Sequence, residues 1–593
     1  MRDTLDFLLF DWLRVQQLCE RDRYAEHGRE SFSAVLDACE KLARERFAPL
    51  NRLIDEQEPR FENGRVVLPA AVQPALQAFV DSGLLMADVD AEQGGMQLPA
   101  AIAMAGNAFF AKASVALHAY MMLTHGNAGL LLAHGSKKQI EVFAQAELEG
   151  RWFGTMCLSE PQAGSSLSDI TTRAEPDGAD FESDPLGVRY KLRGHKMWIS
   201  GGEHELSENI VHLVLAKIPD VEGRLTAGTK GISLFIVPKW KVDASGALTG
   251  EHNDVQLAGL NHKLGYRGTT NCLLNFGEQG GAAGYLVGKP GEGLRCMFHM
   301  MNEARIAVGM GATMLGYAGY EASLEYARQR PQGRALGAKD PGTPQRPIIE
   351  HADVRRMLLA QKSYVEGGLA LGLYCARLLD EQRCGTPEAA REATLLLEIL
   401  TPVAKSFGSE WGLEANSLAI QVLGGAGYTR DFPVEQYWRD NRLNMIHEGT
   451  HGIQGLDLLG RKLLTDNGAA MKLLAARIQT TIAAAPQNWR ERADQLSAAL
   501  ELTVSAAGAA WVDGDAGAAL ANATPFLQAF GHLVVGWLWL DIVSSQGSDS
   551  PKDKGRSAAA HYFYSYELTR LHAWLGVVSL REGYAREVGD DGF

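Results

Sequence analysis

The chain has 593 residues, of which 46% are hydrophobic and 22% are charged, and its formal net charge is -14. This length allows about three to five domains with large cores, and the acidic balance disfavours binding to nucleic-acid phosphates through bulk electrostatics. The seven cysteines are odd in number and never spaced as CxxC, which argues against a disulfide framework or a zinc site and favours a reducing cytoplasm.

The N-terminus predicts a short amphipathic helix rather than a targeting segment. It carries Asp3, Asp6 and Asp11, and it lacks a small-residue cleavage pattern. The nearest candidate for a membrane span, from about Leu533 to Val543, contains Asp541 and is too short to cross a bilayer. We therefore expect no membrane-spanning segment.

The first two thirds of the chain change from helical to strand periodicity and back. Apolar residues at three- and four-residue spacings predict helices from about 31 to 148. Short β-branched or aromatic runs between Gly, Asp and Pro turns predict an antiparallel sheet or barrel from Trp152 to about Val287. Helical periodicity then returns in three long segments, at 295–328, 349–382 and 388–423.

Local features refine this helical half. Pro402 is expected to kink or interrupt the third long helix. The Gly309-x-Gly311 pair lies inside a helix without a preceding strand, so it predicts close helix packing and not a dinucleotide fingerprint. Beyond Leu464 the composition shifts to Ala-rich helices, which predicts an appended helical domain. The expected fold class is mainly α with a central β-barrel domain.

The stretch from Tyr437 to Gly455 concentrates reactive side chains around Glu448. A carboxylate between the apolar Met445-Ile446 pair and Gly449 suits a general base, because desolvation raises its pKa towards the working pH. The alternative is a solvated loop glutamate near arginines.

Two strand ends in the predicted barrel offer binding groups. The run MCLSEPQAGSS, at 156–166, is a strand followed by a turn rich in free backbone N–H groups and hydroxyls, which suits a flavin edge or a phosphate, although an ordinary hairpin has the same pattern. The run GHKMWISGG, at 194–202, ends with Trp198 and Ser200, an apolar face and a donor. The alternative for Trp198 is barrel core.

With HGNAGLLLAHG before them and RDNRLNMIHEGTHGIQ after them, these motifs closely resemble the acyl-CoA dehydrogenases over about residues 40 to 465. The resemblance implies an α-helical, β-barrel and helical-bundle fold followed by an appended C-terminal helical domain. It divides the chain into an N-terminal extension and four domains, at 1–35, 36–154, 155–289, 290–465 and 466–593. The length is similar to a branch of about 600 residues that includes fatty acyl-CoA and 3-methylmercaptopropionyl-CoA dehydrogenases.

The resemblance also implies the site residues. Glu448 would be the catalytic base, since relatives that place the base on the long helix have Glu where this chain has Ala304. Asn302 and Arg305 would meet coenzyme A, unless Arg305 is a solvated helical residue, and Ser165 would lie between coenzyme A and the flavin. The FAD contacts would be Met156, Leu158, Ser159, Ser165, Trp198, Ser200, Arg330, Gln332, Gln421, Gly424, Gly425, Gly449 and Thr450. No metal ligand is implied.

Among these FAD contacts, Arg330, Gln332, Gln421, Gly424 and Gly425 would bind the pyrophosphate and adenine across a subunit boundary, which implies a homodimer. Arg334 is a candidate substitute within this set, because the family's Arg-x-x-Phe-Gly reads Arg-Pro-Gln-Gly-Arg here.

The implied function is α,β-dehydrogenation of a medium- to long-chain fatty acyl-CoA to a trans-2-enoyl-CoA, with FAD as oxidant and an electron-transferring flavoprotein as acceptor. A short thioether or branched acyl-CoA is the alternative substrate.

Two other classes of protein fit the sequence less well than this function. A flavoprotein that binds DNA through its C-terminal domain is disfavoured by ten Lys and Arg against fourteen Asp and Glu from residue 466 onward. A flavin-free scaffold is disfavoured by the presence of Glu448. His447, beside the base, either shifts its pH profile or fills space.

Overall fold

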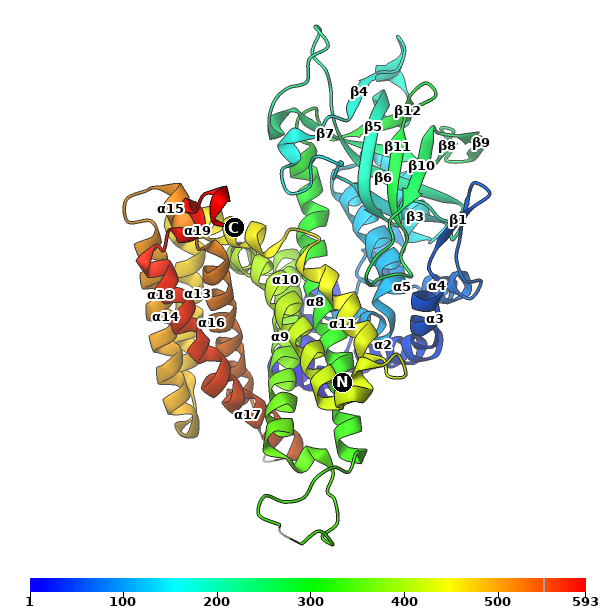
Figure 1. The fold of residues 1–593 in the computed structure, drawn as a ribbon. Coiled ribbons are helices and arrows are strands. Elements are labelled where there is room, and N and C mark those ends of the chain that lie inside the picture. Colours follow the sequence, from blue (N-terminus) through cyan, green and yellow to red (C-terminus); the bar gives the residue numbers. More distant parts are fainter. Residues whose placement is uncertain (339, 548–549) are drawn as a thin grey trace. The chain divides into compact units, whose positions relative to one another are not determined.

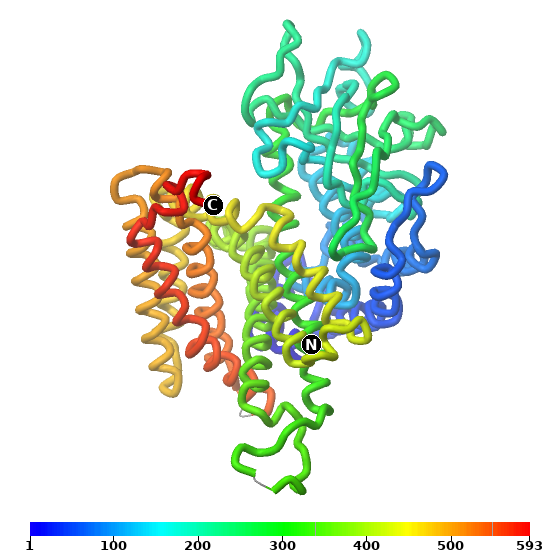
Figure 2. The backbone as a smooth tube through the Cα atoms, viewed as in Figure 1, coloured from blue at the N-terminus to red at the C-terminus, as the bar shows by residue number. Residues whose placement is uncertain are grey.

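The computed structural model describes residues 1–338, 340–547 and 550–593, which form two compact units (Figures 1 and 2). The barrel unit contains Ala38–Gln97 and Ala113–Ala304. The helical unit contains Met1–Asp37, Leu98–Lys112 and Arg305–Phe593. Two long helices, α5 (Ala100–His134) and α8 (Gly293–Gln329), contribute residues to both units.

The barrel unit is built on a closed ring of strands, in the order β5, β12, β7, β6 and β4, with β4 paired to both β6 and β5. Strands β11 and β10 extend the sheet from β5, and β3 extends it from β6. The bounds are β3 Trp152–Cys157, β4 Arg173–Pro176, β5 Arg189–Ser200, β6 Asn209–Lys217, β7 Ile232–Pro238, β10 Val255–Leu260, β11 Asn271–Phe276 and β12 Ala282–Val287. A separate hairpin joins β8 (Trp240–Val242) to β9 (Leu248–His252).

The expected barrel is confirmed, but the expectation of a purely antiparallel sheet was wrong. Strand β6 pairs in parallel with β3 and with β4. Parallel neighbours need a long connection, and residues 158–208 between β3 and β6 supply one. Both β6 and β7 are buried along their whole length, in keeping with their predominantly apolar sequences.

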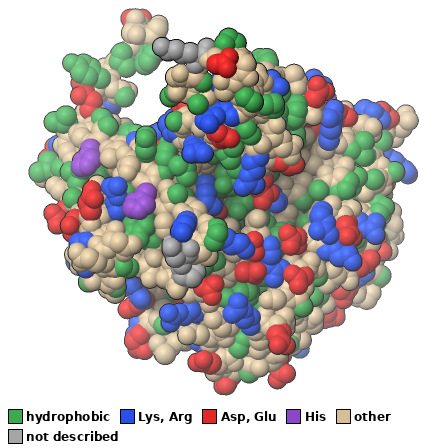
Figure 3. All heavy atoms as spheres, turned by 90° about the horizontal axis from the view of Figure 1, so that it is seen from below, with side chains coloured by type: hydrophobic (Ala, Val, Ile, Leu, Met, Phe, Trp, Pro, Cys, Tyr) green, Lys and Arg blue, Asp and Glu red, His purple; other side chains and the backbone are tan. Residues whose placement is uncertain are grey.

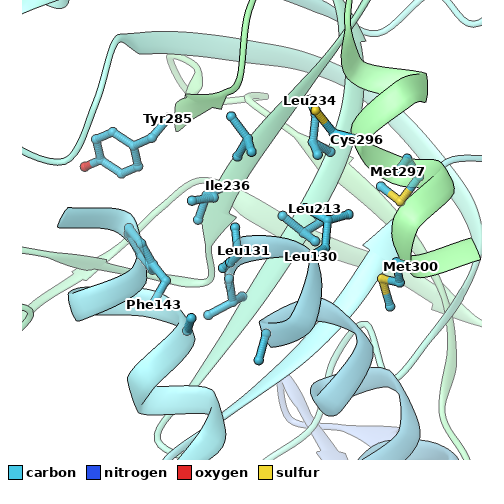
Figure 4. Packing of buried hydrophobic residues seen from close by; sticks show 14 of the residues in the cluster. Leu130, Leu131, Phe143, Leu213, Leu234, Ile236, Tyr285, Cys296, Met297 and Met300 are labelled. Atoms are coloured by element: carbon cyan, nitrogen blue, oxygen red, sulfur yellow. The ribbon is translucent and has the colours of Figure 1, made fainter. Parts of the chain in front are cut away.

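Helices cover one side of this sheet and complete its core. Leu213, Leu234 and Ile236 from the sheet pack with Leu130 and Leu131 of α5, and Phe143, Tyr285, Cys296, Met297 and Met300 surround them (Figure 4). The other helices of this unit are α3 Asn51–Glu56, α4 Val72–Asp81, α6 Lys137–Gln139 and α7 Gln145–Leu148, while α2 (Arg29–Leu42) begins in the helical unit and ends in this one.

A small hairpin interrupts the predicted helices of the N-terminal region. Strands β1 (Arg60–Glu62) and β2 (Arg65–Val67) pair around Asn63 and Gly64, both with positive φ. An Asn-Gly pair is a strong hairpin signal. The sequence therefore indicated this hairpin, but the helical spacing of the apolar residues around it led to the prediction of helix.

The helical unit is centred on α8, α9 (Ala352–Cys384) and α10 (Pro387–Leu423), followed by α11 (Val434–Arg442) and α12 (His451–Asp457). Pro402 lies inside α10, which continues through it, so the predicted interruption was wrong. Gly309 confirms the predicted close packing, because a Cβ there would lie 2.2 Å from the carbonyl oxygen of Ala404.

The C-terminal helices pack as a bundle within the same unit, drawn from orange to red in Figure 2. Helix α16 is apolar on all sides and almost wholly buried, as expected for a central helix. The bounds are α13 Ala469–Ala484, α14 Arg490–Ala510, α15 Ala516–Leu520, α16 Ala523–Ser544, α17 Pro551–Tyr562, α18 Leu571–Leu580 and α19 Tyr584–Glu587.

The N-terminus is helical, as predicted, in α1 (Arg2–Asp6) and a π-helix over Phe7–Trp12, and it buries Leu5, Leu8 and Leu9.

Among the described residues, two helices, α5 and α16, are long and apolar enough to cross a membrane, judged by length and composition alone. In these two helices, 72% and 89% of the apolar windows are buried inside the protein. The sequence expectation overlooked α5, whose residues 113–134 contain no Asp, Glu, Lys or Arg. Buried core helices pass the same test, so the finding is weak evidence for a span.

The packing at Gly309 yields a stability prediction. Gly309→Ala should destabilise the protein by about 1–3 kcal/mol, because the added methyl group meets backbone atoms of α10 that cannot rotate away. Gly508→Ala in α14 is the matched control, because nothing lies within 4 Å of its Cβ position and Ala favours helix, so it should be neutral or stabilising. Thermal unfolding measures both, and equal midpoints for the two variants would contradict the prediction.

Candidate functional site

Glu448 lies in a left-handed turn between a 3-10 turn (Leu443–Met445) and α12. Its φ is 55° and that of Gly449 is 90°. A non-glycine residue in this region costs on the order of 1 kcal/mol, so neighbouring groups must hold the turn. Gln454 Nε2 donates to the Glu448 carbonyl oxygen at 2.8 Å, and Lys405 Nζ donates to the Gly449 carbonyl oxygen at 2.7 Å. Both side chains belong to fully buried residues.

The Glu448 carboxylate is half-buried, and burial raises its pKa, although Arg305 and Lys405 oppose the rise. Burial also lowers the pKa of Lys405 to about 7, against the attraction of Glu448. Among the described residues, none hydrogen-bonds to this carboxylate, and the Glu448 N–H donates to no protein acceptor. The turn therefore presents the Glu448 carboxylate and the Glu448 N–H side by side, and no described residue hydrogen-bonds to either group.

Arg305 is 4% exposed, so the interpretation as a solvated helical residue was wrong. Its Nη1 lies 3.3 Å from Asp457 Oδ2 in α12. Asp457 also approaches Lys462, at 3.9 Å, and Lys462 pairs with Glu398 at 3.0 Å. Arg305 is thus a buried cation with a fixed counter-ion. Asn302, on the barrel-unit part of α8, is half-buried.

The two histidines beside the turn are neutral at physiological pH. Burial lowers the pKa of His447 to about 3, and its Nε2 lies 3.0 Å from Asn444 Oδ1. This favours the space-filling interpretation of His447 over an effect of its charge on the base. Burial also lowers the pKa of His451 to about 4, with Lys405 and Arg442 contributing.

In the barrel unit, the turn after β3 and the end of β5 are tied together. Lys196 Nζ donates to the Leu158 carbonyl oxygen at 2.9 Å, and the Met197 N–H donates to the Ser159 carbonyl oxygen at 3.0 Å. Trp198 follows with a φ of 66° and is 60% exposed, so the barrel-core alternative was wrong.

The other predicted flavin contacts in this unit lie on the same two strands or the turn between them. Ser200, two residues after Trp198, accepts from Asn271 Nδ2 at 3.3 Å. Met156 and Leu158 are half-buried against the core, and Ser165 is exposed in the turn after β3.

A buried ion pair anchors this turn. Lys196 Nζ lies 3.0 Å from Glu160 Oε1, and both side chains are inaccessible to solvent. Glu160 also accepts from the N–H and hydroxyl groups of Thr171 and Thr172, at 2.6–3.0 Å. Burial disfavours the carboxylate, but Lys196 and these donors prevail and lower the pKa of Glu160 to about 2. The turn is therefore fixed by an ionised, fully hydrogen-bonded carboxylate.

The remaining predicted FAD contacts lie at one end of the helical bundle. Arg330, Gln332, Gln421, Gly424 and Gly425 are all exposed. They follow or end α8 and α10, whose last turns share a core with Ile348 and Val434. Arg334 is not free to replace a family contact, because its guanidinium donates to the Thr343 and Pro341 carbonyl oxygens of its own loop.

Sequence reasoning missed Lys405, Gln454, Glu160 and Lys196. A signal for Lys405 was present, since it is a single cation in the apolar run LTPVAKSFG. A lone charge on a buried helix face requires a partner, but the partner is 44 residues away and local pattern does not identify it.

Two family models match the chain: "Acyl-CoA dehydrogenase, C-terminal domain" over residues 291–464, and "Acetyl-CoA dehydrogenase C-terminal like" over residues 474–583. The 3-methylmercaptopropionyl-CoA dehydrogenase of Ruegeria pomeroyi is 36% identical over 584 residues, covering 95% of this chain and 94% of that protein. The broad-specificity linear acyl-CoA dehydrogenase FadE5 of Mycobacterium tuberculosis is 31% identical, covering 100% and 99%.

Solved structures share the fold at low identity. Caenorhabditis elegans ACDH-11 in complex with C11-CoA matches with a TM-score of 0.76 and 19% identity, covering 91% of this chain and 88% of that chain. An acyl-CoA dehydrogenase complexed with FAD from Bacillus anthracis matches with a TM-score of 0.75 and 19% identity, covering 95% and 90%.

The Glu160–Lys196 pair yields a second prediction. Lys196→Met should cost about 3–5 kcal/mol, because it leaves Glu160 buried without its counter-ion, and the protein should lose bound flavin as the turn loosens. Lys191→Met is the matched control on the same strand, because its pair with Asp177 is partly exposed and should contribute about 0–1 kcal/mol. Denaturant unfolding and flavin content measure both variants; a Lys196→Met protein as stable as its control would contradict the assignment.

Proposed function

This chain belongs to the acyl-CoA dehydrogenase family, and from that premise we propose that it oxidises a medium- to long-chain fatty acyl-CoA to a trans-2-enoyl-CoA with Glu448 as the base. The chain is an FAD-dependent oxidoreductase, like its relatives. The observation that carries the assignment of the base is the Glu448 turn. Its half-buried carboxylate has a raised pKa, accepts no hydrogen bond from any described residue, and lies next to the buried Arg305 and Lys405 side chains.

The residues at the β3 and β5 ends fit a flavin. Trp198 leaves a large apolar ring exposed near the end of β5, and the turn after β3, which is hydrogen-bonded to β5 at Met197, adds the exposed Ser165 hydroxyl group. Met156, Leu158, Ser159, Ser165, Trp198, Ser200, Gly449 and Thr450 would hold the ring system. When bound, FAD supplies the acceptor for the hydride that leaves the β-carbon.

Glu448 would remove the α-proton of the thioester. A free carboxylate is too weak a base for this carbon acid, and burial strengthens it by raising its pKa. Arg305 and Lys405 oppose the rise and so favour the ionised form that a base requires. The free Glu448 N–H is a suitable donor to the thioester oxygen, where negative charge develops as the proton leaves.

The acyl group is the open part of the proposal. FadE5 is named for linear acyl-CoAs and the Ruegeria relative for a short thioether, and this chain matches both over nearly its full length. We expect kcat/KM to be highest for straight chains of medium to long length, measured by flavin bleaching with a panel that also contains 3-methylmercaptopropionyl-CoA. A preference for the thioether would establish the second candidate, and no bleaching by any acyl-CoA would overturn the function.

We further propose a cytoplasmic homodimer that passes electrons to an electron-transferring flavoprotein. The exposed set Arg330, Gln332, Gln421, Gly424 and Gly425 supports the dimer, since these residues would bind the partner's FAD. All seven cysteines lie in the described residues and none forms a disulfide there, which supports a reducing compartment. Acidic and basic side chains are interspersed over the face shown in Figure 3, in keeping with a protein that does not bind nucleic acid.

The C-terminal helices would cover the surface that smaller relatives use to form tetramers, and a tetrameric solution mass would refute this.

Replacing the base tests the central assignment. Glu448→Gln should retain FAD and bind acyl-CoA, because it keeps the shape of the side chain, but the rate of flavin reduction should fall by about 10²–10⁴-fold or more. Stopped-flow absorbance measures the rate, and ligand-induced spectral change measures binding. Turnover at the wild-type rate would show that another group is the base.

Removing the neighbouring cation should change the pH profile. Lys405 favours the ionised form of Glu448, so Lys405→Met should raise the pKa of Glu448 and move the acidic limb of flavin reduction to higher pH, by about one unit or more. The difference in the rate of flavin reduction between Lys405→Met and the wild type should narrow above about pH 7, where wild-type Lys405 loses its own proton. Lys472→Met, on an exposed position of α13, is the control and should leave the limb unchanged. An unshifted limb in Lys405→Met would contradict the electrostatic role.

A further inference from the structure

The C-terminal helices contact the segment that carries Glu448 at the level of the backbone. Gly455 of α12 has no room for a side chain, because a Cβ there would lie 2.6 Å from the Ala523 carbonyl oxygen at the start of α16. Just beyond α12, Trp511 Nε1 donates to the Leu459 carbonyl oxygen at 3.2 Å. Helix α12 therefore rests directly on α16, within the helical unit.

A second, polar connection runs from α16 to the first residue of α12. Gln528 Nε2 of α16 donates to Glu410 Oε1 of α10 at 2.6 Å. The other carboxylate oxygen of Glu410 lies 3.6 Å from His451 Nδ1. His451 Nε2 is 3.1 Å from Ser409 Oγ, a hydrogen-bonding distance, so Ser409 orients the imidazole and places its Nδ1 edge beside Glu410.

The charges around this connection come from several elements. Arg570 of the C-terminal region and Glu414 of α10 face Glu410, while Lys405 and Arg442 face His451. Burial raises the pKa of Glu410, and Gln528 and Arg570 oppose this rise. The C-terminal helices thus supply an amide donor and a cation that stabilise the ionised form of a carboxylate next to the turn.

A side chain of α12 hydrogen-bonds to the backbone of the proposed base. Gln454, also in α12, donates to the Glu448 carbonyl oxygen. A shift of α12 would therefore move the carbonyl group that fixes the left-handed turn. Misplacement of a catalytic group by about 1 Å can cost on the order of 10²-fold in rate.

We infer that the appended C-terminal helices position the catalytic base, with Gln528, Glu410 and His451 as positioning residues and the Gly455–Ala523 contact as their backbone counterpart. The inference deepens the proposed function and rests on it for the role of Glu448. It assigns the C-terminal helices a positioning role in the reaction, which relatives without these helices would need to fill with other residues.

The test compares Gln528→Leu, His451→Phe and the double variant in the FAD-bound full chain. Gln479→Leu is the matched control, because it makes the same substitution at an exposed position of α13. Three quantities are measured: the rate constant of flavin reduction at saturating acyl-CoA, the dissociation constant for the acyl-CoA, and hydrogen exchange of the peptide covering residues 447–457.

Gln528→Leu and His451→Phe should each lower the rate constant by about 10-fold and accelerate exchange of the peptide, while FAD content and the dissociation constant stay at wild-type values. Because both act through Glu410, the double variant should be no slower than the slower single variant. Multiplied effects, or an unchanged rate with either variant, would overturn the inference. If Gln528→Leu fails to retain FAD, Gln528→Asn shortens the same donor and carries the test.

Hydrogen exchange separates this inference from the proposed function, because it requires no substrate. Faster exchange in a protein whose wild-type flavin no acyl-CoA reduces would disprove the proposed function and leave the mechanical connection standing. Unchanged exchange in Gln528→Leu would disprove the connection whatever the wild-type activity.

Discussion

The turn that carries Glu448 has to keep a carboxylate in place, largely out of water, on a backbone conformation that its residue type disfavours. Two buried side chains meet this constraint by holding consecutive carbonyl groups, Gln454 at Glu448 and Lys405 at Gly449. Each of them is held in turn by a helix of the bundle. The long helices α8 and α10 pack at Gly309 close enough to exclude a methyl group, and this rigid pair places Arg305 and Lys405 around the turn.

The carboxylates of Glu160 and Glu448 each have a lysine nearby, but their pKa values are shifted in opposite directions. Glu160 accepts four hydrogen bonds from threonines in addition to its ion pair, and its pKa falls to about 2. Burial raises the pKa of Glu448 against the influence of Arg305 and Lys405, and none of the residues that the structure describes donates a hydrogen bond to its carboxylate. Donors directed at the carboxylate, more than the presence of a cation, separate the structural anchor Glu160 from the proposed base Glu448.

The C-terminal helices extend the same logic beyond the bundle. Helix α16 is almost wholly buried and approaches α12 at Gly455. The packing that buries α16 therefore also supports α12. Gln528 adds a directional contact through Glu410, and directional contacts specify a position that apolar packing alone leaves adjustable.

The sequence by itself determined the order of elements, the barrel between Trp152 and Val287 and the long helices, because the period of the apolar residues and the turn chemistry lie in neighbouring residues. It also singled out Glu448, whose role as the base rests on the family resemblance and stays a prediction. It did not determine the parallel pairing of β6, the exposure of Trp198, the burial of Arg305 or the continuity of α10 through Pro402. Nor did it identify Lys405 as the partner of Gly449. These features are decided by contacts between residues tens to hundreds of positions apart, and desolvation, which sets the pKa values of Glu448, Lys405 and His451, exists only once those contacts have closed.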